Sequence, residues 1–315
     1  MRIVVLLGAL TFLSAPAPQT RSAPLADHHQ HLFSPSIAQL ISAKPITVDE
    51  LIALLDAAGI PRAAVLSTAY MYGSPARTVD NEYEKVKREN DWTAQQVARF
   101  PRRLIGFCGF NPLKDYALEE LARCAKLPQL RVGVKMHFAN SAVDYHNPQH
   151  VARLKEVFAA ANKHGMAIIV HMRASISRKL PYGRAEARTV LSEIIPAAPD
   201  VPIQIAHLAG AGGYGEAVVD EALSVFVEAI EKDDPRVRRL WFDVTGVALS
   251  EASPREHSLI ATRIRQLGPQ RVLYGSDAAS APNPPPREGW AVFRKIPLTD
   301  GEFQTIIGNV PPYMR

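Results

Sequence analysis

The chain has 315 residues, 47% of them hydrophobic, and a formal net charge of +5. This length and composition suffice for a single domain with a large buried core. Because the basic residues are interspersed with acidic ones, the sequence excludes the continuous positive stripe of a nucleic-acid-binding protein, and we expect no nucleic-acid partner.

The N-terminus predicts a secretory signal peptide over residues 1–23. Arg2 precedes an apolar run, Ile3–Leu13, and small residues and prolines follow up to Ala23. The run is too short to cross a bilayer comfortably, so we expect cleavage after Ala17 or Ala23, export to the periplasm or medium, and no membrane span after processing. Loss of Arg2 and Arg21 would change the net charge to 5 − 2 = +3. An uncleaved anchor or a misassigned start is the alternative.

The first apolar segment after this leader contains Asp27-His28-His29-Gln30-His31. On a β-strand, positions i and i+2 point to the same side, so His29 and His31 would present two imidazoles to one point. Imidazole nitrogens suit zinc and its neighbours, and an open catalytic zinc site takes about three protein ligands. His28 and Gln30 would then face the layer between barrel and helices, while Asp27 supports the site.

Apolar segments alternate with helical patterns along the rest of the chain, which is typical of repeated β-α units. The eight predicted strands are Ala26–Leu32, Ala63–Ser67, Leu104–Phe110, Val132–Phe138, Ala167–Met172, Pro202–Leu208, Leu240–Thr245 and Arg271–Asp277. A capping box at Thr47–Glu50 begins one helix that closes near Gly59, and another helix is expected around Asp115–Leu127. Eight such units favour an α/β fold, a single-domain (β/α)8 TIM barrel.

The chain contains only two cysteines, Cys108 in a predicted strand and Cys124 in the helix that follows. A disulfide framework therefore does not hold the fold together. We interpret both as buried packing residues, and one bridge between them in an exporting compartment is the alternative.

In a TIM barrel, the active site lies at the carboxyl ends of the strands, and polar residues stand at those positions here. They are Lys135, His137, His171, His207 and Asp277. Their recurrence at successive strand ends predicts one metal site shared with His29 and His31. Long connections after the second, fifth and eighth strands (70–80, 173–183 and 278–287) would form the rim of a substrate pocket.

With these residues in place, the chain resembles the amidohydrolase superfamily, in particular the amidohydrolase-related branch that also contains aminocarboxymuconate-semialdehyde and resorcylate decarboxylases. The resemblance runs from Ala26 to about Val310, within a domain expected over residues 24–315. It rests on Asp27-x-His29-x-His31, Gly133-Val134-Lys135-Met136-His137, Ile169-Val170-His171, Ala206-His207-Leu208-Ala209-Gly210, Gly275-Ser276-Asp277 and Gly308-Asn309.

The resemblance implies that His29, His31, His171 and Asp277 hold a divalent metal ion, most often zinc, and that His207 stands beside it as an acid/base or polarising group. Asp277 would accept a proton from the metal-activated water and pass it to the leaving group.

Lys135 has two interpretations. A carboxylated lysine would bridge two metal ions, whereas a free ammonium would bind an anionic substrate or pair with Asp277. We favour the free ammonium and one ion.

Several side chains are candidates for substrate contact: Lys135, His137, Arg173 and Tyr72. Arginine suits a substrate carboxylate, although an arginine at a loop start is often a surface residue. Tyr70 and Tyr72 either line the pocket or pack the loop, and Asp243 is expected to orient a neighbouring group of the site.

We therefore expect a metal-dependent hydrolase that acts on a small amide, ester or lactone. The alternative is a non-oxidative decarboxylase of an aromatic or muconate-type acid. A TatD-like nuclease is disfavoured because that family expects glutamate where Lys135 stands, and a non-catalytic binding protein would not need both the ligand set and His207. The expected partner is a small-molecule substrate, and a homo-oligomer is compatible with the sequence.

Overall fold

The computed structural model describes residues 22–248, 250–279 and 283–315. The predicted signal peptide lies outside these residues, apart from Ser22 and Ala23, and so does part of the predicted loop 278–287. Within the described part of the chain, the eight strands form one parallel sheet in sequence order, confirming the TIM barrel. The strands are β1 Asp27–Gln30, β2 Ala63–Leu66, β3 Leu104–Gly109, β4 Gly133–His137, β5 Ala167–His171, β6 Ile203–Ile205, β7 Leu240–Asp243 and β8 Val272–Leu273.

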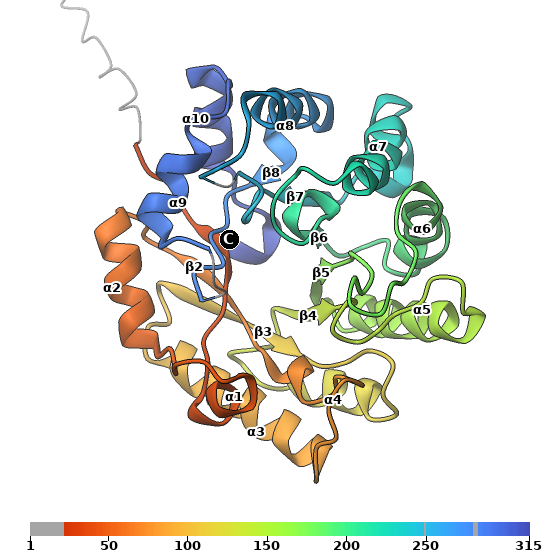
Figure 1. The fold of residues 1–315 in the computed structure, drawn as a ribbon. Coiled ribbons are helices and arrows are strands. Elements are labelled where there is room, and N and C mark those ends of the chain that lie inside the picture. Colours follow the sequence, from red (N-terminus) through yellow and green to blue (C-terminus); the bar gives the residue numbers. More distant parts are fainter. Residues whose placement is uncertain (1–21, 249, 280–282) are drawn as a thin grey trace, which may run out of the picture.

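Helices surround the strands (Figure 1). The α-helices are α1 Pro35–Ile41, α2 Val48–Ala58, α3 Glu82–Ala98, α4 Ala117–Cys124, α5 Pro148–Lys163, α6 Arg184–Thr189, α7 Ala217–Glu231, α8 Pro254–Leu267, α9 Pro286–Phe293 and α10 Asp300–Gly308. The shorter helical elements are η1 Ala69–Met71, η2 Val190–Ile194, η3 Ile195–Ala197, η4 Ala206–Ala209, η5 Pro235–Val237, η6 Pro269–Arg271 and η7 Pro312–Met314. In the part of the chain that is described, none of the helices has the length and hydropathy needed to cross a bilayer.

Local sequence signals account for the predicted helix boundaries. The α2 helix begins with a reciprocal capping box between Thr47 and Glu50 and ends at Gly59, whose φ of 68° suits a residue without Cβ. The helix expected around residues 115–127 is α4.

Backbone hydrogen bonds bring the last strand back to the first. The His28 N–H donates to the Tyr274 carbonyl oxygen at 2.9 Å, and the Asp277 N–H donates to the His29 carbonyl oxygen at 2.8 Å. This closure places the segment after β8 directly beside the His-x-His motif. Gly275 permits the approach, because a Cβ at this position would lie 2.7 Å from the His29 Cβ and 2.2 Å from the Thr245 Oγ1.

The β1 strand departs from the regular alternation that the sequence predicted. Asp27 pairs with Ala63 and Gln30 with Val65, so three steps along β1 match two along β2, as in a β-bulge. The irregularity changes where His28 lies: its ring packs edge to face against Tyr313 with centroids 6.3 Å apart, instead of entering the layer between barrel and helices. His29 still faces the barrel centre.

The apolar core has two parts. The larger one fills the layer between sheet and helices and includes most of the buried aliphatic residues. A smaller cluster contains side chains from several strands together with Met314 of the C-terminal segment. Its buried members are Ala26, Ala64, Leu66, Phe107, Ala167, Ile169 and Met314. The C-terminus accordingly lies within the ring of helices in Figure 1.

A disulfide joins Cys108 of β3 to Cys124 at the end of α4. Both residues are fully buried, as expected of packing residues, and the structure in addition contains the bridge that the sequence left as the alternative. The bond closes a loop with a sequence separation of 16 and ties one barrel strand to its covering helix.

Candidate metal centre

His29 is held in one orientation by a carboxylate on β7. Its Nδ1 lies 3.1 Å from the Asp243 Oδ2, and its Nε2 lies 3.0 Å from the Lys135 Nζ. Burial, followed by the nearby Lys135 charge, lowers the pKa of His29 to about 3. The ring is therefore neutral, with the proton on Nδ1 and a lone pair on Nε2 that points at the barrel centre.

His31 is fixed in the same tautomer by a backbone group. Its Nδ1 lies 2.6 Å from the Leu66 carbonyl oxygen, which can only accept, so Nδ1 carries the proton and Nε2 is left with a lone pair. That Nε2 lies 4.0 Å from the Asp277 Oδ1. Burial is the main cause that holds the pKa of His31 well below its usual range.

His171 ends β5 with an unsatisfied nitrogen. Its Nε2 is buried and has no hydrogen-bond partner among the described residues. The His137 ring stacks on it with centroids 3.9 Å apart, and His207 meets it edge to face at 5.0 Å. Burial lowers the pKa of His171, so this ring is also neutral. A buried polar atom without a partner is costly, which indicates a position built for a ligand or metal.

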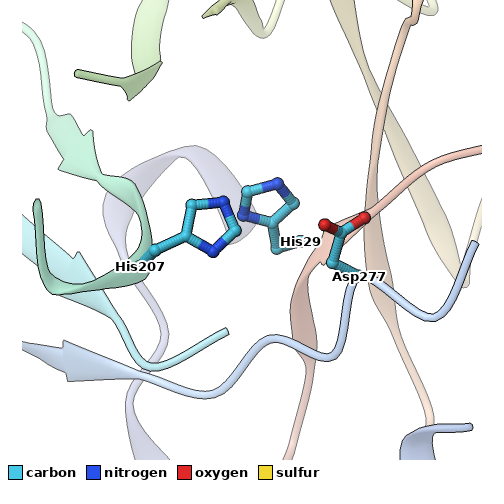
Figure 2. Close-up of side chains that lie close together, drawn as sticks. All are labelled: His29, His207 and Asp277. Carbon is cyan, nitrogen blue, oxygen red and sulfur yellow. The ribbon is translucent and has the colours of Figure 1, made fainter. Parts of the chain in front are cut away.

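His207 and Asp277 reach the centre from strand ends with left-handed backbones. Their φ angles are 55° and 48°. The ligand atoms of His29, His207 and Asp277 all lie within 4.8 Å of one another, and Figure 2 shows the three side chains converging. The His207 Nδ1 lies 2.8 Å from the Thr245 carbonyl oxygen, so its Nε2 carries the lone pair.

Lys135 brings a buried cation into this ring of imidazoles. Burial lowers the pKa of its ammonium to about 8, against the charges of Asp243 and Asp277, which raise it. The amine is therefore mostly protonated at pH 7. The lone pair of the His29 Nε2 can accept a hydrogen bond from Lys135 or bind a metal ion, but not both. A metal ion at this position would therefore compete with Lys135 for the lone pair.

The donor set fits a divalent metal ion. Neutral imidazoles with directed lone pairs and one carboxylate are the ligands of catalytic zinc and related first-row sites. Of the four residues expected as ligands, His29 and Asp277 have ligand atoms within 4.8 Å of one another, while His31 and His171 lie beside them, with ring centroids 5.4 Å from His29 and 5.0 Å from His207, respectively. The structure also places His207 as close to His29 and Asp277 as a ligand would be, so geometry alone does not separate its role from theirs.

Asp243 supports this centre, as expected. Its Oδ1 accepts from the backbone N–H groups of His207 at 2.9 Å and Thr245 at 3.2 Å, and its Oδ2 accepts from His29 and from the Gln204 side chain. Burial alone would raise the pKa of Asp243, but His29 and these hydrogen bonds hold it well below its usual range. The carboxylate thus stays ionised and fixes the tautomer of His29.

The expected substrate residues are divided between two cavities. His137 and Arg173 line a cavity of about 380 Å³ together with His171, Asn140, Ser175 and Ser177. Tyr72 instead lines a cavity of about 490 Å³ between α1 and α3. Tyr70 lies beside His31 and His137, with ring centroids 6.2 and 5.2 Å away, so Tyr70 is the tyrosine nearer to the histidine cluster.

Arg173 is buried at the edge of the first cavity. One terminal nitrogen donates to the Glu216 carboxylate at 2.8 Å, and the guanidinium lies 4.6 Å above the Tyr182 ring. Its Nε is buried and has no partner among the residues that the structure describes. A guanidinium held by a ring face, with one N–H unused, suits recognition of a carboxylate.

Sequence reasoning missed two residues that the site depends on. Gln204 of β6 donates to Asp243, and Tyr313 of η7 donates to Gln204. A polar residue within the apolar run Ile203-Gln204-Ile205 was a signal available in the sequence, because an unpartnered buried amide is costly. Nothing in the sequence pointed to Tyr313.

Several solved structures and one family model resemble this chain. No curated protein matches the sequence. Solved structures with the same fold include the 5-carboxyvanillate decarboxylase LigW from Sphingomonas paucimobilis, which is 18% identical, with a TM-score of 0.63, over 91% of this chain and 97% of that chain. A 5-carboxyvanillate decarboxylase from Novosphingobium aromaticivorans, complexed with manganese and 4-hydroxy-3-methoxy-5-nitrobenzoic acid, is 14% identical, with a TM-score of 0.62, over 91% and 94%.

A probable 2-pyrone-4,6-dicarboxylic acid hydrolase from Acinetobacter baumannii, with citric acid bound, is 16% identical, with a TM-score of 0.57, over 90% of this chain and 96% of that chain. At these identities the likeness concerns the fold. The family model described as amidohydrolase matches residues 26–309, which include every residue of the candidate metal centre. The chain is therefore a member of the amidohydrolase family and an enzyme of the amidohydrolase superfamily.

Proposed function

We propose that this protein is a metal-dependent hydrolase acting on a small ester, lactone or amide that also carries a carboxylate. The observation that carries the proposal is the buried Lys135 ammonium in a ring of neutral imidazoles; a metal ion on the His29 Nε2, now 3.0 Å from the Lys135 Nζ, would leave the ammonium free to contact substrate. Such a centre offers positive charge where the carbonyl oxygen of a substrate becomes negative as water adds.

The histidines and Asp277 would provide the metal ligands and the proton acceptor. When bound by His29, His31, His171 and Asp277, a divalent ion supplies Lewis acidity and lowers the pKa of a coordinated water. His207 has its proton on Nδ1, so its Nε2 can take a proton from water or substrate but cannot donate one until it has done so. We therefore assign His207 as a proton acceptor, rather than as the donor to the carbonyl oxygen.

The same cation argues against decarboxylation as the main reaction. When carbon dioxide is lost, the electron pair of the breaking C–C bond stays on the substrate carbon and the carboxylate loses its negative charge, so a cation beside it stabilises the bound substrate more than the transition state. A carboxylate held against the Lys135 ammonium would be stabilised in the ground state, which slows its departure. Hydrolysis gains from the same contact because negative charge grows on oxygen.

Arg173 supports a carboxylate on the substrate. It shares the cavity with His137, whose Nδ1 accepts from the Asn140 backbone N–H at 3.2 Å, which leaves an Nε2–H donor. Together they provide a charged and a neutral donor beside His171. Replacing Arg173 by Gln should raise KM for a carboxylated substrate about 30-fold, the loss of one charge-assisted hydrogen bond, and change KM for its uncharged ester much less.

We propose zinc, one ion per chain, as the resident metal. Imidazole and carboxylate are both ligand types of catalytic zinc, although a similar decarboxylase structure carries manganese. Metal analysis after reconstitution, with the mass of intact Lys135, tests the number of ions. Two ions per chain with an added carboxyl group on Lys135 would contradict the proposal.

A second candidate function is non-oxidative decarboxylation of an aromatic acid. It is favoured by the Arg173 carboxylate position and by the decarboxylase names of several proteins with the same fold. One experiment separates the two: the metal-loaded enzyme is incubated with lactones, esters, amides and aromatic acids while proton release and carbon dioxide are both recorded. Hydrolysis predicts proton release without carbon dioxide. Carbon dioxide from an aromatic acid favours the second candidate, and an Asp277→Asn variant should be inactive in either case.

We also propose that the mature protein works in an oxidising compartment outside the cytoplasm. The apolar segment before Ala23 has the composition of a signal peptide, and the Cys108–Cys124 bond is of the kind that persists outside the cytosol. Fractionation of cells that express the full chain, with N-terminal sequencing of the product, tests this. An intact N-terminus in the cytosolic fraction would contradict it.

A further inference from the structure

The C-terminal segment packs inside the barrel, against residues at or near the starts of β1, β2 and β5. Met314 of η7 is fully buried in the cluster that contains Ala64 and Phe107, and the Tyr313 ring lies edge to face on Phe107 with centroids 5.3 Å apart. Figure 1 shows the C-terminus within the ring of helices. Packing alone explains the two apolar contacts, but it does not explain the phenol hydroxyl of Tyr313.

That hydroxyl donates to the Oε1 of Gln204, a buried residue of β6. The NH2 group of Gln204 points toward β7 and donates to the Asp243 Oδ2 at 2.6 Å and to the His28 carbonyl oxygen at 3.3 Å. Both of these oxygens can only accept, so they set the orientation of the amide. The Tyr313 hydroxyl satisfies the remaining Oε1 of Gln204 and so holds the side chain in the position from which it donates to Asp243.

Asp243 connects Gln204 to the metal centre. Its Oδ1 is held by two backbone N–H groups, so the position of Oδ2 depends on Gln204 on one side and on His29 on the other. The contact at 3.1 Å between Oδ2 and the His29 Nδ1 keeps the proton on Nδ1. A continuous chain of hydrogen bonds thus runs from the C-terminal segment to a residue at the barrel centre.

We propose that Tyr313 is a positioning residue for the metal centre, acting through Gln204 and Asp243 to hold His29 in the tautomer that presents Nε2 to a metal ion. The inference rests on the proposed function insofar as a metal binds at His29. It assigns the C-terminal segment a role in the site and not only in closing the bottom of the barrel. Second-sphere partners of this type change metal affinity by about 10- to 100-fold when removed.

The test uses the full chain, three single variants and one double variant. Tyr313→Phe keeps the ring and removes the hydroxyl, and Gln204→Leu removes the next link. Tyr274→Phe is the matched control, because the Tyr274 hydroxyl also donates one buried hydrogen bond, to the Pro286 carbonyl oxygen at 2.7 Å, without contacting Asp243. Affinity for Co²⁺ is measured with the visible spectrum of the bound ion, and ¹⁵N spectra of the metal-free, histidine-labelled proteins report the tautomer of His29.

We expect Tyr313→Phe to weaken Co²⁺ binding about 10-fold and to shift His29 toward a mixture of tautomers, while Tyr274→Phe changes neither. Adding Tyr313→Phe to Gln204→Leu should have no further effect, because the chain is already broken. Wild-type affinity and tautomer in Tyr313→Phe, or equal losses in both tyrosine variants, would overturn the inference. If the wild-type protein binds no metal but the tautomer still shifts in Tyr313→Phe, the positioning role stands and the proposed metal function fails.

Discussion

Glu89 offers a quantitative test of how the structure couples pH to stability near the active site. This residue of α3 is 3% exposed, and its carboxylate accepts from the Ser34 hydroxyl at 2.5 Å. The Thr68 hydroxyl lies 3.4 Å from its other oxygen. Glu89 therefore joins the loop after His31 to the loop after β2. Burial, which outweighs these hydrogen bonds, raises the pKa of Glu89 from 4.5 to about 7.

The sign of the pH dependence follows from that pKa. Because the folded-state value is raised, the folded protein binds more protons than the unfolded chain between pH 4.5 and 7, so the stabilisation present below pH 4.5 is lost as pH rises through this window. From pH 5 to pH 8 the contribution of Glu89 to the free energy of unfolding should fall by about 2.5 kcal/mol. Glu89→Gln resembles the protonated acid and cannot ionise. We therefore expect it to match the wild type near pH 5 and to exceed it by about 2 to 3 kcal/mol at pH 8.

Urea denaturation followed by circular dichroism, at intervals from pH 5 to pH 8, gives both curves. Their difference isolates Glu89 from the other titrating groups. Glu84→Gln on the same helix is the control, because Glu84 is 57% exposed and solvent screens its pair with Lys87, so this substitution should leave the shape of the pH curve unchanged. If the Glu89→Gln and wild-type curves run parallel across the whole range, the carboxylate is ionised without cost in the folded protein, and the reasoning is refuted.

Three further predictions concern the site and the scaffold. Gly275→Ala should destabilise the protein by about 1 to 3 kcal/mol and weaken metal binding, because the added Cβ would lie 2.7 Å from the His29 Cβ. Urea denaturation measures the change in stability, and Co²⁺ titration measures the change in metal affinity. An unchanged stability and affinity would contradict the close approach of Gly275 to His29. Cys108→Ser with Cys124→Ser should lower the free energy of unfolding by about 3 kcal/mol, the value for a loop of this length, and added reductant should then have no effect. Dialysis against a chelator should abolish activity and zinc should restore it, whereas full activity in the chelated protein would exclude a metal-dependent reaction.

The barrel and most of the metal centre could be predicted because both depend on patterns local to each strand. Every expected strand is present, and most of them are short apolar runs followed by a polar residue, as β5 is at His171. The carboxyl ends of parallel strands meet at one end of a barrel, so a polar residue at each end predicts a shared site without any knowledge of distances. His171 was identified by this argument and His29 by the His-x-His spacing, while their expected role as ligands came from the family resemblance.

The features that could not be predicted depend on contacts between distant segments. The tautomer of His207 is set by a carbonyl oxygen 38 residues away, and the hydroxyl that completes the hydrogen bonding of Gln204 belongs to a tyrosine 109 residues away. The bulge in β1 arises from pairing with β2 and has no signature in Asp27-His28-His29-Gln30. Roles that depend on which nitrogen carries a proton therefore required the structure, even though the residues themselves did not.

The backbone at the two strand ends that carry His207 and Asp277 supports the interpretation of this region as a functional site. His207, Leu208 and Ala209 are consecutive, buried and left-handed, and Asp277 is left-handed as well. A non-glycine residue in this conformation costs about 1 to 3 kcal/mol, and glycine would avoid the cost. At His207 and Asp277, however, glycine would remove the imidazole and the carboxylate that converge on His29. The chain therefore keeps a left-handed backbone at positions where the side chain is needed. At Gly275, by contrast, the absence of a side chain is what allows the segment after β8 to lie against His29.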